Sequence, residues 1–333
     1  MTTHKEYRLR QITSASGTSW QVIRPDGEPV ADAARFLRAI ALRGLSPNSL
    51  LTYAYDLLSI YRWMHQNQLS PDRVSGEDLL RFVDYLCTQA PVCPSLINAR
   101  LGIFQRLIAF LTGSPPVISA WQPMRKGSRR KGTPHGVVRI KQPHRVVRPL
   151  TDAEVCGFFN SLHTWRDRAI TMLMLCLGLR AREVISILID DLDLQHMTLL
   201  VHGKGNKERV LPIAEPVANT ILHYLRAERP SSSSAALFVV LKGKRRGRSM
   251  TYAGLRRLFR YHRAISAVIR ANPHRFRHTF GANMIKANMP LLSLSKLMGH
   301  SSPTTTMRYV QIHDADLRDQ YLKALNNNPL SNA

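Results

Sequence analysis

The sequence has little acidic charge and few cysteines, and it lacks any long apolar segment. Among its 333 residues, 22 aspartates and glutamates stand against 47 lysines and arginines, which gives a formal net charge of +25. The four cysteines are too few for a disulfide scaffold, and since none lies in a C-x-x-C pair, a zinc ribbon is disfavoured. We interpret them as reduced, buried thiols.

The longest apolar run, residues 169–179, has only 11 residues, whereas a membrane-spanning helix needs about 20. The N-terminus has no apolar signal core. We therefore expect a soluble, cytoplasmic protein without a membrane partner. The 44% hydrophobic content argues against a disordered polycation, and the length favours two domains that each bury a core.

The large positive charge must be solvated or matched by a polyanion. Nucleic acid is the commonest such partner, because lysines and arginines that neutralise phosphates release condensed counterions. Anionic membrane surfaces and ribosomal RNA are alternatives, and the charge by itself does not separate them.

The first half of the chain shows three kinds of pattern. Residues 1–29 alternate apolar and polar side chains around a turn, which predicts an N-terminal extension with a β-hairpin. Residues 30–120 carry four segments of helical period joined by short loops, which predicts a compact helical domain. Residues 121–149 predict a basic interdomain linker, rich in Gly and Pro and without acidic residues; its basic residues are Arg125, Lys126, Arg129, Arg130, Lys131, Arg139, Lys141, Arg145 and Arg148.

Residues 150–333 form the second predicted domain. Thr151 predicts a helix cap, and residues 167–179 predict a buried helix. Strands are predicted at 197–202 and 209–213 around a Gly-rich turn, with a third at 237–241 before a basic loop. The predicted fold class is therefore mainly α, with a small antiparallel β-sheet in the second domain.

Three polar segments of this domain carry candidate chemistry: residues 178–183, 203–205 and 273–309. His274 and His278 have the spacing of the histidines in H-E-x-x-H zinc enzymes, but Arg275 occupies the glutamate position. Cations around the imidazoles oppose a dication, so we predict no metal. Guanidinium and imidazole groups suit a phosphate instead, including the extra negative charge of a pentavalent phosphorane.

The order and spacing of these segments resemble the catalytic domain of the tyrosine recombinase (phage integrase-like) family. The resemblance covers about residues 150–325. It rests on R-x-x-E at 180–183, G-K-G-N-K-E-R at 203–209, H-R-F-R-H at 274–278, L-M-G-H at 297–300 and M-R-Y at 307–309. The helical region 31–113 resembles the family's N-terminal core-binding (SAM-like) domain in pattern alone.

The resemblance implies a role for each matched position. Arg180 and Arg277 would hold the scissile phosphate, and His274 and His300 would donate hydrogen bonds to it and assist proton transfer. Each of these residues taken alone has an ordinary explanation, such as a helix cap or a core histidine. Their joint order and spacing favour the functional interpretation.

Two of the remaining matched positions would act on the phosphodiester bond that breaks and on the phosphotyrosine bond that forms. Tyr309 would be the nucleophile that forms a 3′-phosphotyrosine link, and Lys204 would be the general acid that protonates the departing 5′-oxygen. Glu183 would orient the neighbouring basic groups, and His278 is interpreted as structural. Arg182 departs from the pattern by placing a bulky cation between Arg180 and Glu183.

The resemblance also implies how the chain handles DNA. Two domains would enclose the duplex as a C-shaped clamp, and a homotetramer would hold two specific recombination sites through exchange of the C-terminal tail. Accessory or sister recombinases are further expected partners, and no cofactor is expected, since side chains supply the charge. Candidate DNA contacts, assigned from helix placement and charge, are Asn48, Arg62, Asn98, Arg100, Arg125, Lys126, Arg129, Arg130, Lys131, Lys244, Arg245 and Arg246.

The predicted function is site-specific DNA recombination in the bacterial cytoplasm, in association with the nucleoid. Integration, excision or transposition of a mobile element is the leading role, and Xer-like dimer resolution is the alternative. A type IB topoisomerase would share the chemistry without site choice. A catalytically silent DNA-binding protein would have lost at least one of the matched positions, and none is lost.

Overall fold

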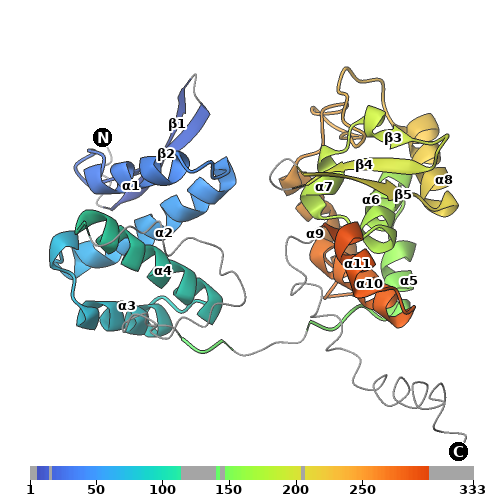
Figure 1. Cartoon of the computed structure of the whole chain (residues 1–333). Helices are drawn as coiled ribbons and strands as arrows, with labels where there is room; N and C mark the ends of the chain where they lie inside the picture. The colour runs from blue at the N-terminus through green and yellow to red at the C-terminus, as the bar shows by residue number, and fades with distance from the viewer. Residues whose placement is uncertain (1–5, 15–16, 114–139, 143–146, 204–206, 300–333) are drawn as a thin grey trace, which may run out of the picture. The chain divides into compact units, whose positions relative to one another are not determined.

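The computed structural model describes residues 6–14, 17–113, 140–142, 147–203 and 207–299. It divides into two compact units, Met1–His144 (unit 1) and Arg145–Ala333 (unit 2), whose elements are labelled in Figure 1. Each unit has a hydrophobic core of its own. The two are therefore described separately.

The described part of unit 1 holds four α-helices in the places that the sequence periodicity predicted. Ser46 and Ser75 accept hydrogen bonds from the first turns of the second and third helices. Proline opens the second and fourth helices, where its missing N–H breaks no helical hydrogen bond. The helices are α1 (Ala31–Ala41), α2 (Pro47–Gln66), α3 (Gly76–Thr88) and α4 (Pro94–Leu111), with a 3-10 turn, η1 (Pro71–Arg73), before α3.

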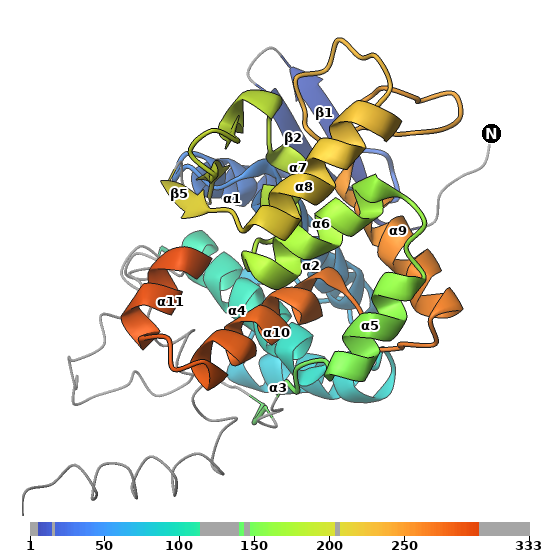
Figure 2. The same ribbon diagram turned by 90° about the vertical axis from the view of Figure 1, so that its right-hand side faces the viewer.

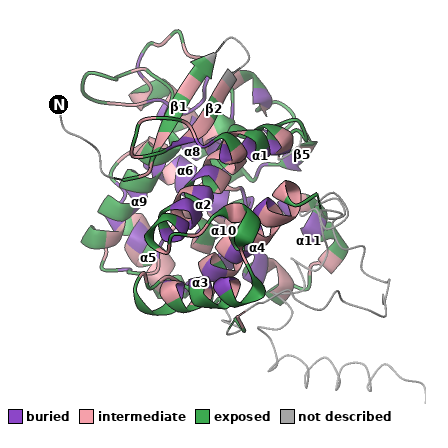
Figure 3. Cartoon of the chain, turned by 90° about the vertical axis from the view of Figure 1, so that its left-hand side faces the viewer, coloured by how far each residue is buried: buried purple, intermediate pink, exposed green. Residues whose placement is uncertain are grey.

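Aromatic rings join three of these helices at the centre of unit 1. Trp63 of α2 lies 5.1 Å from Phe82 of α3 and 6.0 Å from Phe104 of α4, measured between ring centroids. All three rings are buried. Figure 3 shows the buried stretches along α2 and α4 and the exposed outer side of α3. Burial of such aromatic surface is the main favourable term that holds the helices together.

The predicted N-terminal hairpin is present and packs on α2. Strands β1 (Arg8–Ser14) and β2 (Gly17–Ile23) pair antiparallel. The Arg62 guanidinium of α2 donates two hydrogen bonds to the backbone carbonyl of Tyr7, at 2.8 and 3.1 Å, and the Tyr7 ring stacks on Tyr61. The hairpin is therefore an integral part of unit 1.

Residue 140, which follows α4 by about 30 positions, is hydrogen-bonded to that helix. The Asn98 amide of α4 donates to the Ile140 carbonyl and accepts from the Ile140 N–H, both at 2.9 Å. At the other end, the Leu150 N–H donates to Thr279 of unit 2 at 2.9 Å. Most of the predicted linker, 121–149, lies outside the described residues. Of its described residues, Ile140 is bound to unit 1 by these contacts, and residues 147–149 belong to unit 2.

Unit 2 is built around α6 (Trp165–Cys176), the helix predicted to be buried. Ala169, Ile170, Leu173 and Met174 are fully enclosed, because α6 packs against both α8 and α10 (Figure 2). The other described helical elements are α5 (Asp152–Asn160), α7 (Ala181–Ser186), a 3-10 turn η3 (Ile189–Asp191), α8 (Glu215–His223), a π-helical turn η4 (Tyr224–Glu228), α9 (Tyr252–Ile265), α10 (Pro273–Lys286) and α11 (Leu291–Met298).

The sheet of unit 2 has the strand order β3-β4-β5, and its strands are antiparallel. Strands β4 (Thr198–His202) and β5 (Glu208–Pro212) confirm the predicted hairpin, and β3 (Leu192–Asp193) adds a short edge. The Gly203 N–H donates to the Lys207 carbonyl at 2.7 Å and closes the base of the turn. The prediction of a mainly helical fold with a small antiparallel sheet is confirmed.

Two sequence expectations about unit 2 and the thiols are wrong. Residues 237–241 form no strand, because their N–H groups are dispersed among different partners, including the Tyr224 hydroxyl and the Ile187 carbonyl. The four cysteines are free as expected, but they are exposed and not buried. Within the described ranges, no helix has the length and apolarity needed to cross a bilayer.

Candidate active site

Arg180 is positioned by a turn that only glycine permits. Gly178 has a φ of +65°, and a Cβ atom there would lie 2.4 Å from the Phe280 ring of α10. The chain can therefore turn from α6 into α7 directly against α10. Arg180 precedes α7, and its guanidinium donates to Glu183 at 2.7 Å and to the Gly299 carbonyl at 2.9 Å.

Arg277 reaches the same place from α10. The residue is 3% exposed, and its guanidinium donates to the carbonyls of Gly178 and Met298, the latter at 2.7 Å. One of its nitrogens also lies 3.8 Å from the Glu183 carboxylate. Two arginines that are 97 positions apart are thus held by one carboxylate and by the ends of α6 and α11.

Glu183 is the buried centre of this arrangement. Its carboxylate accepts from Arg180 and from both terminal nitrogens of Arg209, at 2.7, 3.2 and 2.9 Å. Burial by itself would raise the pKa of Glu183, but the hydrogen bonds from Arg209 and from the Arg180 backbone outweigh it and lower that pKa. One carboxylate therefore partly neutralises three guanidiniums and leaves a cluster with net positive charge.

The two predicted histidines of α10 differ in exposure. His274 is exposed in the first turn of the helix, whereas His278, one turn later, is buried. Burial, together with the charges of His274 and Arg275, lowers the pKa of His278. The burial of His278 agrees with a structural role, whereas His274 lies at the surface.

Three predicted catalytic residues, Lys204, His300 and Tyr309, lie outside the described residues. The chain is described up to the positions next to two of them. Gly203 ends the strand side of the β4–β5 turn, and Gly299 ends α11 with a φ of +61°. Because the Gly299 carbonyl accepts from Arg180, the residue before His300 is in contact with the arginine cluster.

His202 joins the base of the β4–β5 hairpin to the neighbouring 3-10 turn η3. Its Nε2 lies 3.0 Å from Asp191 and its Nδ1 lies 3.0 Å from Glu208. The hydrogen bond to Asp191 is the largest cause that raises the pKa of His202. A protonated imidazole can donate to both carboxylates at once, whereas a neutral imidazole can donate to only one.

We expect His202 to titrate above the ordinary histidine pKa of about 6.5. The stability from this contact is then complete below about pH 6.5 and is lost as the pH rises through the higher pKa of the folded state. An NMR titration of the imidazole resonances measures it, with the Asp191→Asn variant moving the midpoint down. In the same spectrum, the pKa of His278 should lie below the ordinary histidine value. A His202 midpoint at or below 6.5 would contradict the prediction.

A second histidine cluster in unit 2 connects neighbouring helices through side-chain contacts. Ser161 Oγ lies 3.3 Å from His262 Nδ1, and His262 Nε2 lies 3.4 Å from Asp167. The groups match the order of a hydrolase triad, but all three residues are buried, and Ser161 donates to the Phe158 carbonyl. The cluster therefore ties α6 and α9 to the end of α5.

The predicted DNA contacts of unit 1 are placed in different surroundings. Asn48 is exposed in the first turn of α2. Arg62 and Asn98 hold the hairpin and residue 140, as described above, and Arg100 lies 3.5 Å from the buried carboxylate of Asp56. Arg125, Lys126, Arg129, Arg130 and Lys131 lie outside the described residues.

Unit 2 carries exposed basic residues that sequence reasoning found only in part. The predicted loop residues Lys244, Arg245 and Arg246 are exposed. Helix α9 adds exposed arginines that were missed, although their spacing on one helical face could have shown them: Arg256, Arg257 and Arg260. The unusual Arg182 places its guanidinium 5.4 Å from the Tyr252 ring centroid, a cation–π contact that joins α7 to α9.

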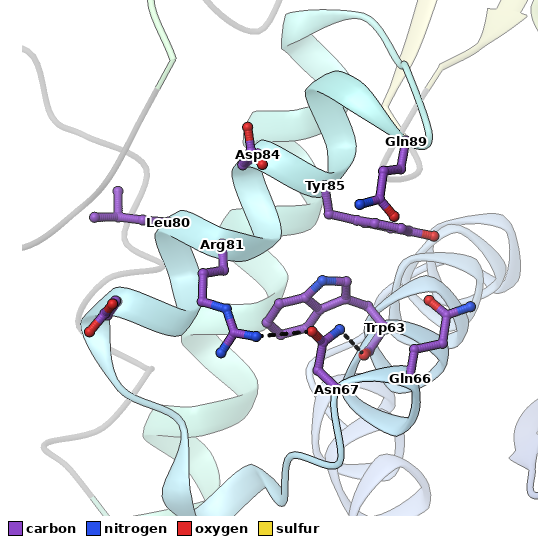
Figure 4. Close-up of a pocket in the computed structure, with 9 residues that line it drawn as sticks. Trp63, Gln66, Asn67, Leu80, Arg81, Asp84, Tyr85 and Gln89 are labelled. Carbon is purple, nitrogen blue, oxygen red and sulfur yellow. Dashed lines mark hydrogen bonds between the residues drawn. The ribbon is translucent and has the colours of Figure 1, made fainter.

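A cavity of about 930 Å³ in unit 1 contains none of the predicted site residues. Figure 4 shows it between the end of α2 and α3, where Arg81 donates to the Asn67 amide oxygen and Asn67 donates to the Trp63 carbonyl. Glu77 and Asp84 add negative charge to its lining. These carboxylates disfavour binding of a nucleic-acid phosphate in this cavity.

Comparison with known proteins gives a consistent result. Residues 148–316 match the phage integrase family, and residues 33–111 match the N-terminal SAM-like domain of phage integrases. The tyrosine recombinase XerC of Chlorobaculum tepidum is 35% identical over 308 residues, which cover 85% of this chain and 90% of the relative. The tyrosine recombinase XerD of Yersinia pestis is 27% identical over 299 residues, covering 85% and 93%.

Solved structures share the fold. XerH site-specific recombinase, in a pre-cleavage complex with its difH substrate, has a TM-score of 0.62 at 17% identity and covers 88% of this chain and 85% of its own. The Tn1549 transposon integrase, in complex with transposon right end DNA, has a TM-score of 0.63 at 18% identity and covers 84% and 94%.

Proposed function

Because this chain belongs to the phage integrase family and is a tyrosine recombinase, a site-specific DNA recombinase, we propose that the Arg180–Glu183–Arg277 cluster binds the scissile phosphate. The observation that carries this proposal is the convergence of two guanidiniums from distant segments on one buried carboxylate. The Glu183 carboxylate holds both arginines in place before the substrate arrives. Preorganised positive charge stabilises a phosphorane without the cost of reorganising water.

In the proposed reaction, the Tyr309 oxygen attacks the phosphorus and displaces the 5′-oxygen of the broken strand. The new bond joins the tyrosine oxygen to the 3′-phosphate, and the bond from phosphorus to the 5′-oxygen breaks. Lys204 gives a proton to the departing oxygen. His274 and His300 donate hydrogen bonds to the phosphate and assist proton transfer, and one of them takes up the proton that the Tyr309 hydroxyl loses. The covalent link conserves the phosphodiester energy, so a 5′-hydroxyl of another strand can reverse the step and complete strand exchange.

DNA binding is proposed to use charged surfaces from both units. In unit 2, the loop residues Lys244–Arg246 and the exposed arginines of α9 bind phosphates of the DNA backbone. The strength of this binding depends on salt concentration and not on DNA sequence. In unit 1, Asn48 stays a candidate base contact, together with the basic segment 125–131. A C-shaped clamp around the duplex and a homotetramer assembled by exchange of the C-terminal tail complete the proposal.

We propose integration, excision or transposition of a mobile element as the biological role, carried out in the cytoplasm on nucleoid DNA, with accessory or sister recombinases as further partners. The basic segment 121–149 before the catalytic domain supports it, because it is longer than a compact dimer-resolution enzyme needs. Xer-like dimer resolution is the second candidate, and the similarity to XerC and XerD over 85% of the chain supports it.

The test is covalent capture on DNA that flanks the gene. Nicked duplex fragments tiled across the flanks are incubated with the protein, and the adduct is trapped when the short cleaved fragment diffuses away. We expect one preferred cleavage site and a phosphotyrosine peptide that contains Tyr309. Cleavage without site preference would favour a topoisomerase, and failure to form any adduct would favour a silent DNA-binding protein.

Replacement of Arg277 by lysine is expected to slow adduct formation about 10²–10³-fold, the typical cost of losing one preorganised donor. Lysine keeps the charge but cannot bond the Met298 and Gly178 carbonyls and still face a phosphate, because it lacks the planar fork. Single-turnover cleavage of the nicked substrate measures it. An Arg229→Lys variant is the control, since Arg229 likewise donates to backbone carbonyls, and loss of rate there to the same extent would contradict the assignment.

A further inference from the structure

Arg209 lies on β5, five residues after the proposed general acid Lys204, and neither its charge nor its position in the sequence singled it out. Its side chain is 14% exposed. Charged side chains are rarely buried to this extent unless they are fully paired. The hydrogen-bond partners of Arg209 therefore indicate which segments its buried guanidinium holds together.

The contacts of Arg209 join three segments of unit 2. Its terminal nitrogens donate to the two carboxylate oxygens of Glu183, at 3.2 and 2.9 Å, in the bidentate geometry of the strongest ion pairs. Its Nε donates to the Leu297 carbonyl in the last turn of α11 at 2.9 Å. One guanidinium thus connects strand β5, the Glu183 carboxylate of the arginine cluster and helix α11, which precedes His300 in the chain.

The end of α11 is shaped to fit this guanidinium. A Cβ atom on Gly299 would lie 2.9 Å from Nη1 of Arg209 and 3.1 Å from its central carbon. Gly299 also has a φ of +61° and presents its carbonyl to Arg180. The backbone of α11 therefore ends in close contact with Arg209 on one side and with Arg180 on the other.

We propose that Arg209 is a positioning residue that holds strands β4 and β5, between which the chain carries the proposed general acid Lys204, in register with the Arg180–Glu183–Arg277 cluster. The inference rests on the proposed function of that cluster. Without Arg209, β5 would keep its backbone pairing to β4 but would lose its only described side-chain ion pair to α7. A shift of about 1 Å in the hairpin is enough to cost a proton transfer about 10²-fold.

Lysine cannot replace Arg209 in this role. Three acceptors on two elements are bonded by three nitrogens of one rigid plane, and an ammonium group on a flexible stem cannot reach all of them. Arg209→Lys preserves the charge of the site and tests geometry alone. The matched control is Arg270→Lys, because Arg270 makes a bidentate pair with Glu154 in the same unit and neither residue belongs to the cluster.

The experiment compares two nicked duplexes, one with a normal scissile phosphate and one with sulfur in place of the bridging 5′-oxygen. A thiol has a pKa of about 8.5, so the sulfur leaves without a general acid. We expect Arg209→Lys to form adduct about 10–100-fold more slowly than the wild type on the normal substrate. On the sulfur substrate we expect the two rates to agree within about threefold, because the misplaced Lys204 is no longer needed.

The ratio of the two rates in one preparation does not depend on how much of the variant is folded. Arg270→Lys should match the wild type on both substrates. Wild-type rates for Arg209→Lys on the normal duplex, or an equal defect on both duplexes, would overturn the inference and leave the proposed function intact. Failure of the wild type to form any adduct would overturn the proposed function itself.

Discussion

Tyr309→Phe is expected to form no covalent adduct with any DNA substrate while keeping its affinity for the recombination site. The substitution removes a single oxygen, the atom that bonds to phosphorus in the proposed reaction, and keeps the aromatic ring. No neighbouring group can substitute for a missing nucleophile, so the loss is complete and not a reduced rate. Denaturing gel electrophoresis of labelled nicked duplex measures the adduct, and a mobility shift under native conditions measures binding.

Tyr85→Phe is the matched control. It removes a phenol oxygen from the lining of the cavity in unit 1, which contains no proposed catalytic residue. Adduct formation at the wild-type rate is expected there. A covalent adduct that persists in Tyr309→Phe would show that another side chain attacks the phosphate, and the assignment of Tyr309 would have to be withdrawn.

Glu183→Gln is expected to lower the free energy of unfolding of unit 2 by about 3–5 kcal/mol, the usual cost of breaking a buried ion pair from one side. The amide would leave the Arg180, Arg209 and Arg277 guanidiniums without a countercharge. Its NH₂ group would also face guanidinium donors in place of an acceptor. Urea unfolding followed by a probe within unit 2 measures the change.

Glu154→Gln is the control for this measurement. It removes a more exposed carboxylate from the pair with Arg270, and glutamine can still take part in the capping box with Thr151. A loss of about 1 kcal/mol or less is expected. Equal losses in the two variants would contradict the central role of Glu183.

The stability difference between Glu183→Gln and the wild type should also depend on pH. Hydrogen bonds outweigh burial and lower the pKa of Glu183 in the folded state, so its contribution is complete above the unfolded value of about 4.3. It is lost as the pH falls through the lower folded-state pKa. A difference that stays constant down to strongly acidic pH would contradict the assigned direction.

Elements with strong local signals could be predicted from the sequence. Thr151 caps α5, the helix that it was expected to begin, and the Gly-rich turn lies between two strands. The segment 237–241 shows the limit of this reasoning. Its side chains are apolar and β-branched as in a strand, yet its N–H groups find a tyrosine hydroxyl and separate backbone carbonyls instead of one neighbouring strand.

The proposed catalytic set was predicted from motif spacing, but the contacts around Arg180 and Arg277 were not. Arg209 stood in the motif as one more basic residue, since nothing in sequence indicates that its guanidinium bonds Glu183, which is 26 positions away. Arg62 and Asn98 were predicted as DNA contacts, and nothing in the sequence indicated that their polar groups also bond backbone atoms of residues 7 and 140. Such partners depend on which segments meet in three dimensions.

The sequence by itself determined the family and the mainly helical fold, and it singled out the positions proposed here as catalytic. These depend on composition, on local periodicity and on the order of motifs along the chain. Only the tertiary structure decided that Glu183 holds Arg180, Arg209 and Arg277 together, and that Arg209 links β5 to the end of α11. The physical reason is that these long-range ion pairs are set by the packing of α10 against both α6 and α11, and no short stretch of sequence contains that packing.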